Sequence, residues 1–227
     1  MTLPEPLVGS VQAVYEDADL LVLQKPSGLL CVPGRGPDKQ DCMSARAQQR
    51  WPGALIVHRL DQATSGLVLM ARHIDAQRAL SHAFAERQVH KRYQAVVQGQ
   101  MGLADKGEGG SESAWGEIDL PIAADWERRP LRIIDPVAGK PSLTRWRALG
   151  HDRTTHTTRL ELEPFTGRTH QLRVHLAAVG HAILGDALYA DATTHAQAPR
   201  LLLHACHLAF THPATGEPIT LDSAPDF

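Results

Sequence analysis

Residues that could carry out acid–base or nucleophilic chemistry are concentrated in one short run, His58-Arg59-Leu60-Asp61-Gln62-Ala63-Thr64-Ser65-Gly66. The run places a cation, a carboxylate and two hydroxyls between a short segment that ends at Val57 and an apolar strand expected over Gly66–Ala71. Functional groups concentrate on loops that a rigid scaffold holds, so Asp61 is a candidate nucleophile or proton-transfer group. A structural carboxylate that caps a turn or pairs with Arg59 is the alternative, and the run alone does not decide between them.

A second run, Gly167-Arg168-Thr169-His170-Gln171-Leu172-Arg173-Val174-His175, combines a glycine turn with cationic and amide side chains. The run is expected to open a helix with Thr169 as its N-cap and Gly180 as its C-terminal glycine. Free N–H groups at a helix N-terminus attract anions, so Arg168 and Thr169 could position a phosphate or orient a catalytic carboxylate. An ordinary capped helix with a solvated basic face is the alternative.

A third run, Lys91-Arg92-Tyr93, puts an aromatic ring directly after two cations at the head of a predicted strand. Aromatic rings stack on bases, and neighbouring cations hold the nucleic-acid backbone. Packing of Tyr93 in the core or at its rim is the alternative.

Metal, dinucleotide and kinase chemistry are not expected. His204-Ala205-Cys206-His207 has no second ligand pair at zinc spacing, and no His-Glu-x-x-His, Gly-x-Gly-x-x-Gly or phosphate-binding glycine–lysine motif occurs. The His58–Asp61 run differs from a kinase catalytic loop by an inserted leucine. The three cysteines form no C-x-x-C pair and are expected to be free thiols in a reducing compartment.

The elements that must position these residues are mostly strands. A hairpin is expected over Val11–Tyr15 and Leu20–Gln24, with further strands over Gly66–Ala71, Tyr93–Val97, Ser142–Leu149, Thr157–Glu163 and Leu201–Phe210. Helices are expected over Cys42–Trp51, from Ala76 to Arg87 with Asp75 as the cap, and after Thr169. The Gly- and Ser-rich segment Gly102–Glu117 is expected to be an exposed loop. This pattern predicts a β-rich α+β protein.

Composition agrees with a soluble globular protein, since 43% of the 227 residues are apolar and 21% are charged. No stretch approaches the roughly 20 apolar residues that a membrane-spanning helix needs, and the N-terminal segment resembles no signal peptide. We expect a cytosolic protein. The net charge of −2 does not itself indicate a polyanionic partner. The basic residues do cluster, and could form a local positive surface: His58 and Arg59; Arg87, His90, Lys91 and Arg92; Arg128, Arg129 and Arg132; Arg168, His170, Arg173 and His175.

Taken together, these runs resemble the RluA family of pseudouridine synthases. The resemblance rests on His58-Arg59-Leu60-Asp61 through Leu67, on the preceding Lys25-Pro26-Ser27-Gly28, and on later blocks that follow in family order. Those blocks are Lys91-Arg92-Tyr93, Gly167 to His175, Gly185-Asp186 and Leu201-Leu202-Leu203-His204-Ala205. The resemblance covers about Val11 to Phe227 and is strongest to short members of the family, apart from a Gly102–Glu117 loop that is longer and more polar than expected. It implies the pseudouridine synthase fold, with a mixed, mainly antiparallel β-sheet flanked by helices and loops, in one catalytic domain over residues 1–227 without an S4-like domain.

The resemblance also implies roles for individual residues. Asp61 would be the catalytic aspartate, Tyr93 the ring stacked on the target base, and Arg168 the cation paired with Asp61. Leu203 would form an apolar floor beneath the base, and Arg59 would fill the RNA stack when the target uridine leaves it. Further substrate contacts are implied for His58, Thr64, Lys91 and Arg173.

The implied reaction is isomerisation of uridine in RNA without a cofactor or metal. The implied partners are a tRNA anticodon stem-loop, a hairpin of 23S rRNA, or both, with no membrane partner and with a monomeric protein as the default. A paralogue that modifies a single RNA and an RNA-binding protein that has lost catalysis are the alternatives. A glycoside hydrolase is disfavoured because it needs two carboxylates at the bond, and the motifs supply one.

Overall fold

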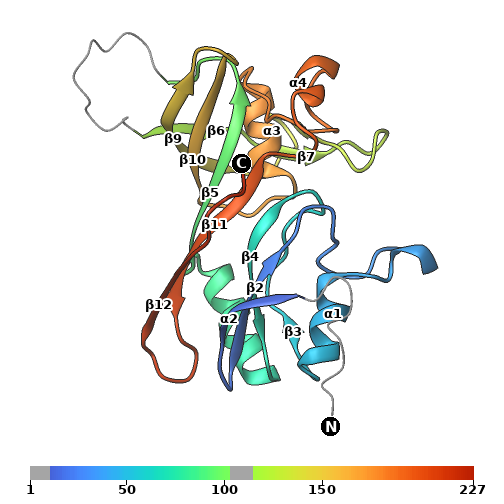
Figure 1. The fold of residues 1–227 in the computed structure, drawn as a ribbon, viewed down its shortest axis with the longest axis vertical. Helices are drawn as coiled ribbons and strands as arrows, with labels where there is room; N and C mark the ends of the chain where they lie inside the picture. Colours follow the sequence, from blue (N-terminus) through green and yellow to red (C-terminus); the bar gives the residue numbers. More distant parts are fainter. Residues whose placement is uncertain (1–10, 103–114) are drawn as a thin grey trace. The chain divides into compact units, whose positions relative to one another are not determined.

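The computed structural model describes residues 11–102 and 115–227. The chain divides into two compact units (Figure 1), the first up to Val89 together with Ala209–Ser223, and the second over His90–Leu208 together with Ala224–Phe227. Among the described residues, no helix is both long and apolar enough to cross a membrane. That residues 1–227 act as one catalytic domain stays a prediction.

The first unit is built on two strands without an exposed face. Its elements are β1 (Gln12–Glu16), β2 (Leu20–Lys25), η1 (Pro37–Lys39), α1 (Met43–Arg50), β3 (Leu55–Ile56), β4 (Ser65–Ala71), α2 (Ile74–Ala85) and β12 (Pro218–Asp222). The apolar runs of β2 and β4 pair antiparallel from Leu20 opposite Ala71 to Lys25 opposite Gly66. Continuous apolar runs of this length are typical of strands buried on both faces, and every residue of β4 is buried.

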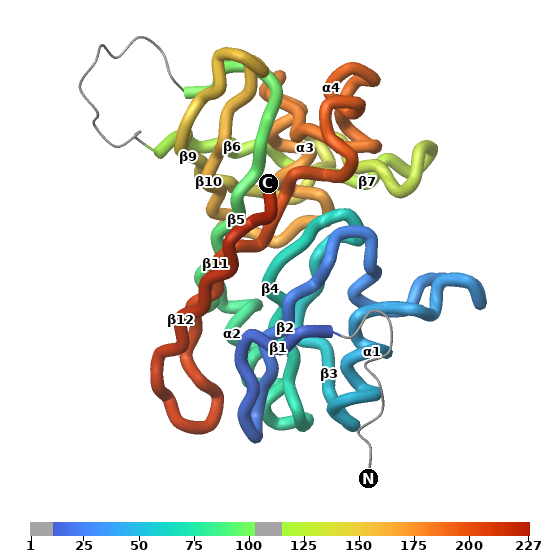
Figure 2. Tube along the Cα trace, viewed as in Figure 1, coloured from blue at the N-terminus to red at the C-terminus, as the bar shows by residue number. Residues whose placement is uncertain are grey.

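The remaining elements of the first unit cover this pair. β1 extends the sheet beside β2 (Figure 2), β3 pairs with β4, and α2 packs on β3 and β4. The predicted hairpin, the Gly66–Ala71 strand and both helices are therefore present. The predicted cap of α2 is wrong, because His73 and not Asp75 precedes the helix, and its side chain accepts a hydrogen bond from the N–H of Ala76.

The second unit has a sheet in the order β11-β5-β10-β9-β6 and a separate hairpin of β7 and β8. Its elements are β5 (His90–Gln98), β6 (Gly116–Asp119), β7 (Ile122–Ala124), β8 (Arg132–Ile134), β9 (Leu143–Asp152), β10 (Thr157–Pro164), α3 (Gln171–Ala178), α4 (Ala192–Ala196) and β11 (Leu203–Thr211), whose last residues belong to the first unit. The long strands β5, β10 and β9 pair antiparallel, and α3 packs on β8, β9 and β10. The predicted α+β class with a mainly antiparallel sheet is confirmed.

The elements missing from the sequence-based prediction are short. They are η1, β3, β6, β7, β8, α4 and β12, none longer than five residues. The predicted loop Gly102–Glu117 falls mostly outside the described residues, and its last two residues belong to β6. Short strands carry too few residues for an alternating pattern to stand out.

In the second unit, two backbone segments approach so closely that position 185 must be a glycine. Gly185 has a φ of +72°, and a Cβ atom built on it would lie 1.9 Å from the carbonyl oxygen of Arg200. Only glycine therefore fits where the segment before Asp186 crosses the segment before β11.

Gly185→Ala should destabilise the protein by about 2–5 kcal/mol, because it combines left-handed backbone strain with a clash against backbone atoms that cannot rotate away. Thermal and urea unfolding measure the loss. Gly150→Ala is the control, since a Cβ there meets nothing within 4 Å. Equal unfolding midpoints for the two variants would contradict this account of Gly185.

Candidate active site

The loop that carries Asp61 is held from within the protein by a buried lysine. The Lys25 side chain has no exposed surface, and its Nζ donates to the carbonyl oxygens of Pro26 (2.9 Å), Gln62 (2.9 Å) and Thr64 (2.7 Å). The N–H of Thr64 in turn donates to the carbonyl of Asp61 at 3.1 Å, which closes a tight turn. Each of the three ammonium protons can thus donate to one carbonyl oxygen. Two of these carbonyls lie in the turn that begins at Asp61.

The residues after Lys25 bind the same loop. The N–H of Gly28 donates to the Gln62 carbonyl at 2.9 Å, and Gln62 Nε2 donates back to the Gly28 carbonyl at 3.0 Å. Ser27 Oγ donates to the Ala63 carbonyl at 2.7 Å. The Lys25-Pro26-Ser27-Gly28 block is therefore the partner of the Asp61 loop, which explains why the two runs occur together.

On the other side of Asp61, the chain is fixed by buried side chains. The N–H of Leu60 donates to Cys31 Sγ at 3.2 Å, and Leu60 itself is buried. His58 accepts a hydrogen bond at Nε2 from the N–H of Leu69 in β4 (3.0 Å) and stacks on Phe84 of α2, with ring centroids 4.5 Å apart. These contacts give His58 a positioning role, and its predicted contact with substrate stays a prediction.

The polar side chains of this loop differ in their exposure to solvent. Arg59 is exposed, Asp61 is half-buried and Thr64 is buried. Asp61 thus lies partly exposed on a turn whose backbone is held by hydrogen bonds.

Charge in this region follows from burial. Burial lowers the pKa of Lys25 to about 8, while the negative charge of the Asp61 carboxylate acts to raise it. Burial raises the pKa of the Cys31 thiol. At neutral pH, Lys25 is therefore a cation whose charge attracts Asp61, and Cys31 is a neutral thiol rather than a nucleophile.

In the second unit, Tyr93 and Leu203 come from neighbouring strands. Tyr93 lies on β5 opposite Leu162 of β10 and is half-buried. Leu203 begins β11 and is 3% exposed. Next to it, the Leu202 carbonyl accepts from the N–H of Val96 in β5 at 3.2 Å. Lys91, two residues before Tyr93, has a pKa that burial lowers.

Arg168 lies on an exposed turn that Gln171 organises. The Oε1 atom of Gln171 accepts from the N–H of Arg168 (3.0 Å) and from Thr166 Oγ1 (2.7 Å), while its Nε2 donates to the Leu143 carbonyl of β9 (3.0 Å). The predicted cap Thr169 is wrong, because α3 begins after His170, which has a left-handed φ of 58°. The guanidinium of Arg168 itself donates to the Pro141 carbonyl at 3.3 Å and is otherwise exposed.

Two residues of the same basic run lie in the interior. Arg173 is 4% exposed and donates twice to Asp186, at 2.8 and 2.6 Å. His175 has no exposed surface, and burial lowers its pKa, so the imidazole is neutral at pH 7. The expectation that the clustered basic residues form one positive surface is therefore wrong for Arg173 and His175. RNA contact by Arg173 stays a prediction.

Sequence reasoning did not single out a cluster of Asp17, Asp19 and His212 in the first unit, whose potential ligand atoms lie within 4.8 Å of one another. His212 Nδ1 accepts from the N–H groups of Ala214 and Thr215, so its Nε2 carries the proton and donates to Asp17 at 2.9 Å. A protonated nitrogen cannot ligate a metal. The cluster is better described as a hydrogen-bonded contact between two turns, and no local spacing in the sequence joins His212 to Asp17.

Comparison with known proteins identifies the class to which this fold and this loop belong. The model of the RNA pseudouridylate synthase family matches residues 19–178. That range contains Lys25, Asp61, Tyr93 and Arg168. The chain belongs to this family, and it is an isomerase that makes pseudouridine in RNA.

Particular relatives agree over nearly the whole chain. The dual-specificity RNA pseudouridine synthase RluA of Haemophilus influenzae is 41% identical over 98% of this chain and 96% of its own length. The RluA of Escherichia coli is 43% identical over 94% and 93%. Among solved structures, human RNA pseudouridylate synthase domain containing 1 superposes with a TM-score of 0.78 at 29% identity, covering 99% of this chain and 87% of that chain. The resemblance to the RluA family and the pseudouridine synthase fold are therefore confirmed.

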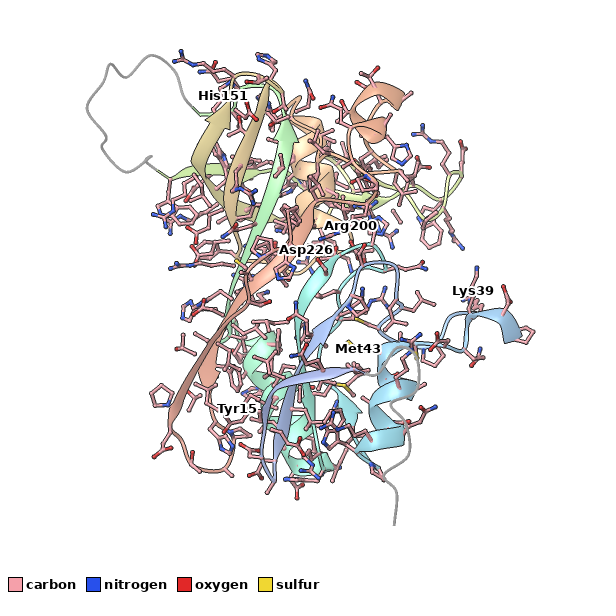
Figure 3. The ribbon with its side chains drawn as sticks, viewed as in Figure 1. Tyr15, Lys39, Met43, His151, Arg200 and Asp226 are labelled. Atoms are coloured by element: carbon pink, nitrogen blue, oxygen red, sulfur yellow. The ribbon has the colours of Figure 1, made fainter. Side chains whose placement is uncertain are left out.

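Lys25→Met should lower kcat about 10²-fold, because it removes the cation that fixes the backbone of the Asp61 loop, and a misplacement of about 1 Å costs on that order. Unfolding stability should fall by about 3 kcal/mol, since buried carbonyls lose their donor. Pseudouridine formation and urea unfolding measure the two effects. Lys39→Met, at an exposed lysine (Figure 3), is the control. A normal kcat in Lys25→Met would refute the positioning role.

The pKa of Lys25 also makes stability depend on pH. Its folded pKa of about 8 lies below the unfolded value of 10.5, so between these values the unfolded state binds more protons and stability rises with pH. The unfolding free energy of wild type minus that of Lys25→Met should therefore increase by about 3 kcal/mol from pH 8 to pH 10.5. Urea unfolding of both proteins across this range measures it, and a flat difference would contradict a lowered pKa.

Proposed function

We propose that Asp61 is the catalytic aspartate of this pseudouridine synthase. The observation that carries the proposal is the cradle of Lys25, Ser27 and Gly28, which binds the backbone on the C-terminal side of Asp61 at Gln62, Ala63 and Thr64. A cradle so specific to one short loop is expected where a side chain must keep its direction.

The chemistry requires one carboxylate and a closed site. Uridine becomes pseudouridine when the N1–C1′ bond breaks, the uracil turns, and C5 bonds to C1′ while the C5 proton moves to the ring nitrogen. Product and substrate are isomers, so no redox cofactor enters the balance. The freed uracil must stay bound until it rejoins the sugar, which demands a pocket that excludes water.

The other predicted residues have roles that suit a base removed from the RNA stack. Tyr93 would stack on the target uracil, and Leu203 on the neighbouring strand would supply an apolar surface beneath it. Arg59 is exposed, as a residue that fills the vacated stack must be. Together these contacts would offset the few kcal/mol that extrusion of a nucleotide costs. Pairing of Arg168 with Asp61, and contacts of His58, Thr64, Lys91 and Arg173 with substrate, stay part of this proposal.

For the substrate, we propose a uridine in a tRNA anticodon stem-loop and a second in a hairpin of 23S rRNA. The support is similarity to relatives that are named dual-specificity RNA pseudouridine synthases. The protein would act as a monomer in the cytoplasm. Incubation with unmodified tRNA and 23S rRNA fragments, followed by carbodiimide mapping, should detect product in both RNAs. Product in one RNA alone would favour the single-substrate alternative.

Asp61→Asn should reduce turnover at least 10³-fold while RNA affinity changes less than threefold, because the amide keeps the shape of the carboxylate and loses its charge and nucleophilicity. Single-turnover assays and filter binding measure the two quantities. Asp75→Asn, at an exposed carboxylate on α2, is the matched control. Turnover within tenfold of wild type in Asp61→Asn would refute the assignment.

A further inference from the structure

The loop between β7 and β8 displays an aromatic ring to solvent. Trp126 is 72% exposed, more than any other aromatic side chain in the part of the chain that the structure describes. The guanidinium carbon of Arg129 lies 3.9 Å from the centre of its ring. Arg129 covers one face of the indole, and the high exposure leaves the other face open to water. A ring of this size gains free energy when a partner covers it.

The turn that carries this pair is closed by several hydrogen bonds. Asp125, 8% exposed, accepts hydrogen bonds from the N–H of Arg128 at 3.1 Å and from its Nε at 2.8 Å. The N–H of Asp125 donates to the Leu131 carbonyl, and the N–H of Leu131 donates to the Arg128 carbonyl. Binding to Trp126 therefore needs little further ordering of the backbone, which favours affinity.

The same hairpin is connected to the turn of Arg168. The hydroxyl of Tyr189 accepts from the N–H of Arg132 in β8 at 2.9 Å and forms a hydrogen bond of 2.7 Å with His170 Nδ1. His170 is the N-cap of α3, two residues after Arg168. The β8 end of this hairpin and the turn of Arg168 are thus joined through Tyr189 within the second unit.

We propose that Trp126 and Arg129 bind a nucleotide of the RNA substrate other than the target uridine, with its base stacked on the open face of the indole and its phosphate bound by Arg129. Aromatic side chains beside arginines are the usual platforms for unpaired bases, and a guanidinium matches the geometry of phosphate. This inference rests on the proposed function, since hairpin loops are what supply unpaired bases next to a target uridine.

The charges of the loop favour RNA over an apolar protein surface. Asp125 is buried and paired with Arg128, and Arg129 is the other cation of the loop, with Glu127 as the exposed acid beside it. A purely apolar partner would desolvate the Arg129 guanidinium without supplying an anion.

Trp126→Ala should raise KM and the dissociation constant for a synthetic tRNA anticodon stem-loop about 10- to 100-fold, because stacking on one aromatic residue contributes affinity on that order. The kcat should stay within twofold, since the target uridine is bound elsewhere. Trp126→Phe should recover most of the affinity. Val137→Ala removes another exposed apolar side chain, 95% exposed, from the turn after β8 and should change nothing.

An abasic scan of the RNA loop identifies the base by comparing wild type with Trp126→Ala. At one loop position other than the target, removal of the base should weaken RNA binding by wild type as much as the Trp126→Ala substitution does. The same abasic RNA should bind to Trp126→Ala with an affinity within twofold of that of the intact RNA. Affinities of Trp126→Ala within twofold of wild type, or additive losses at every loop position, would overturn the proposal. Turnover of the hairpin by wild type distinguishes a failure of the proposed substrate from a failure of the proposed stacking site. No turnover by wild type contradicts the proposed substrate. Normal turnover by wild type, with no loss of affinity in Trp126→Ala, contradicts only the stacking site.

Discussion

The buried ammonium of Lys25 is the interaction on which the Asp61 loop depends. A lysine without exposed surface loses its hydration, and it remains charged near pH 7 because three carbonyl oxygens replace the water. The carbonyl of Gln62 also accepts from the N–H of Gly28. The lysine donates to the loop, and the loop supplies acceptors for its ammonium group. The short loop can stay irregular because its backbone is bound from the inside.

In the second unit, an amide side chain and a buried ion pair hold the irregular segments. Gln171 uses both ends of its amide to join the Arg168 turn to β9, and Arg173 meets Asp186 in a buried, doubly hydrogen-bonded pair. Asp186 Oδ1 also accepts from the N–H groups of Leu188 and Tyr189. A buried ion pair adds little net stability when its desolvation is counted. Its value here is orientation, because it fixes α3 against the segment that supplies Tyr189.

Sequence alone predicted the long elements and the reactive loop. The apolar positions of α2 recur at helical spacing, and the apolar runs of β2 and β4 have the length of buried strands. The caps were wrong at Asp75 and Thr169, because His73 and a left-handed His170 take positions that residue preferences do not favour. The role of Lys25 was missed for another reason. Its acceptors include backbone carbonyls 37 and 39 residues away, and because every residue has a carbonyl, the residue types there do not indicate the contact.

The motifs of this chain therefore contain two kinds of residue. Arg59 and Arg168 are exposed, whereas Lys25, His58, Gln171 and Arg173 are held by contacts within the protein. Both kinds are polar, so residue type does not distinguish them, and only the structure shows which contacts each side chain makes. In the first unit, Lys25 and His58 hold the run that contains Asp61. In the second unit, Gln171 holds the turn of Arg168, and Arg173 holds α3. A buried cation that binds the backbone beside a carboxylate is accordingly better support for a proposed active site than the carboxylate alone.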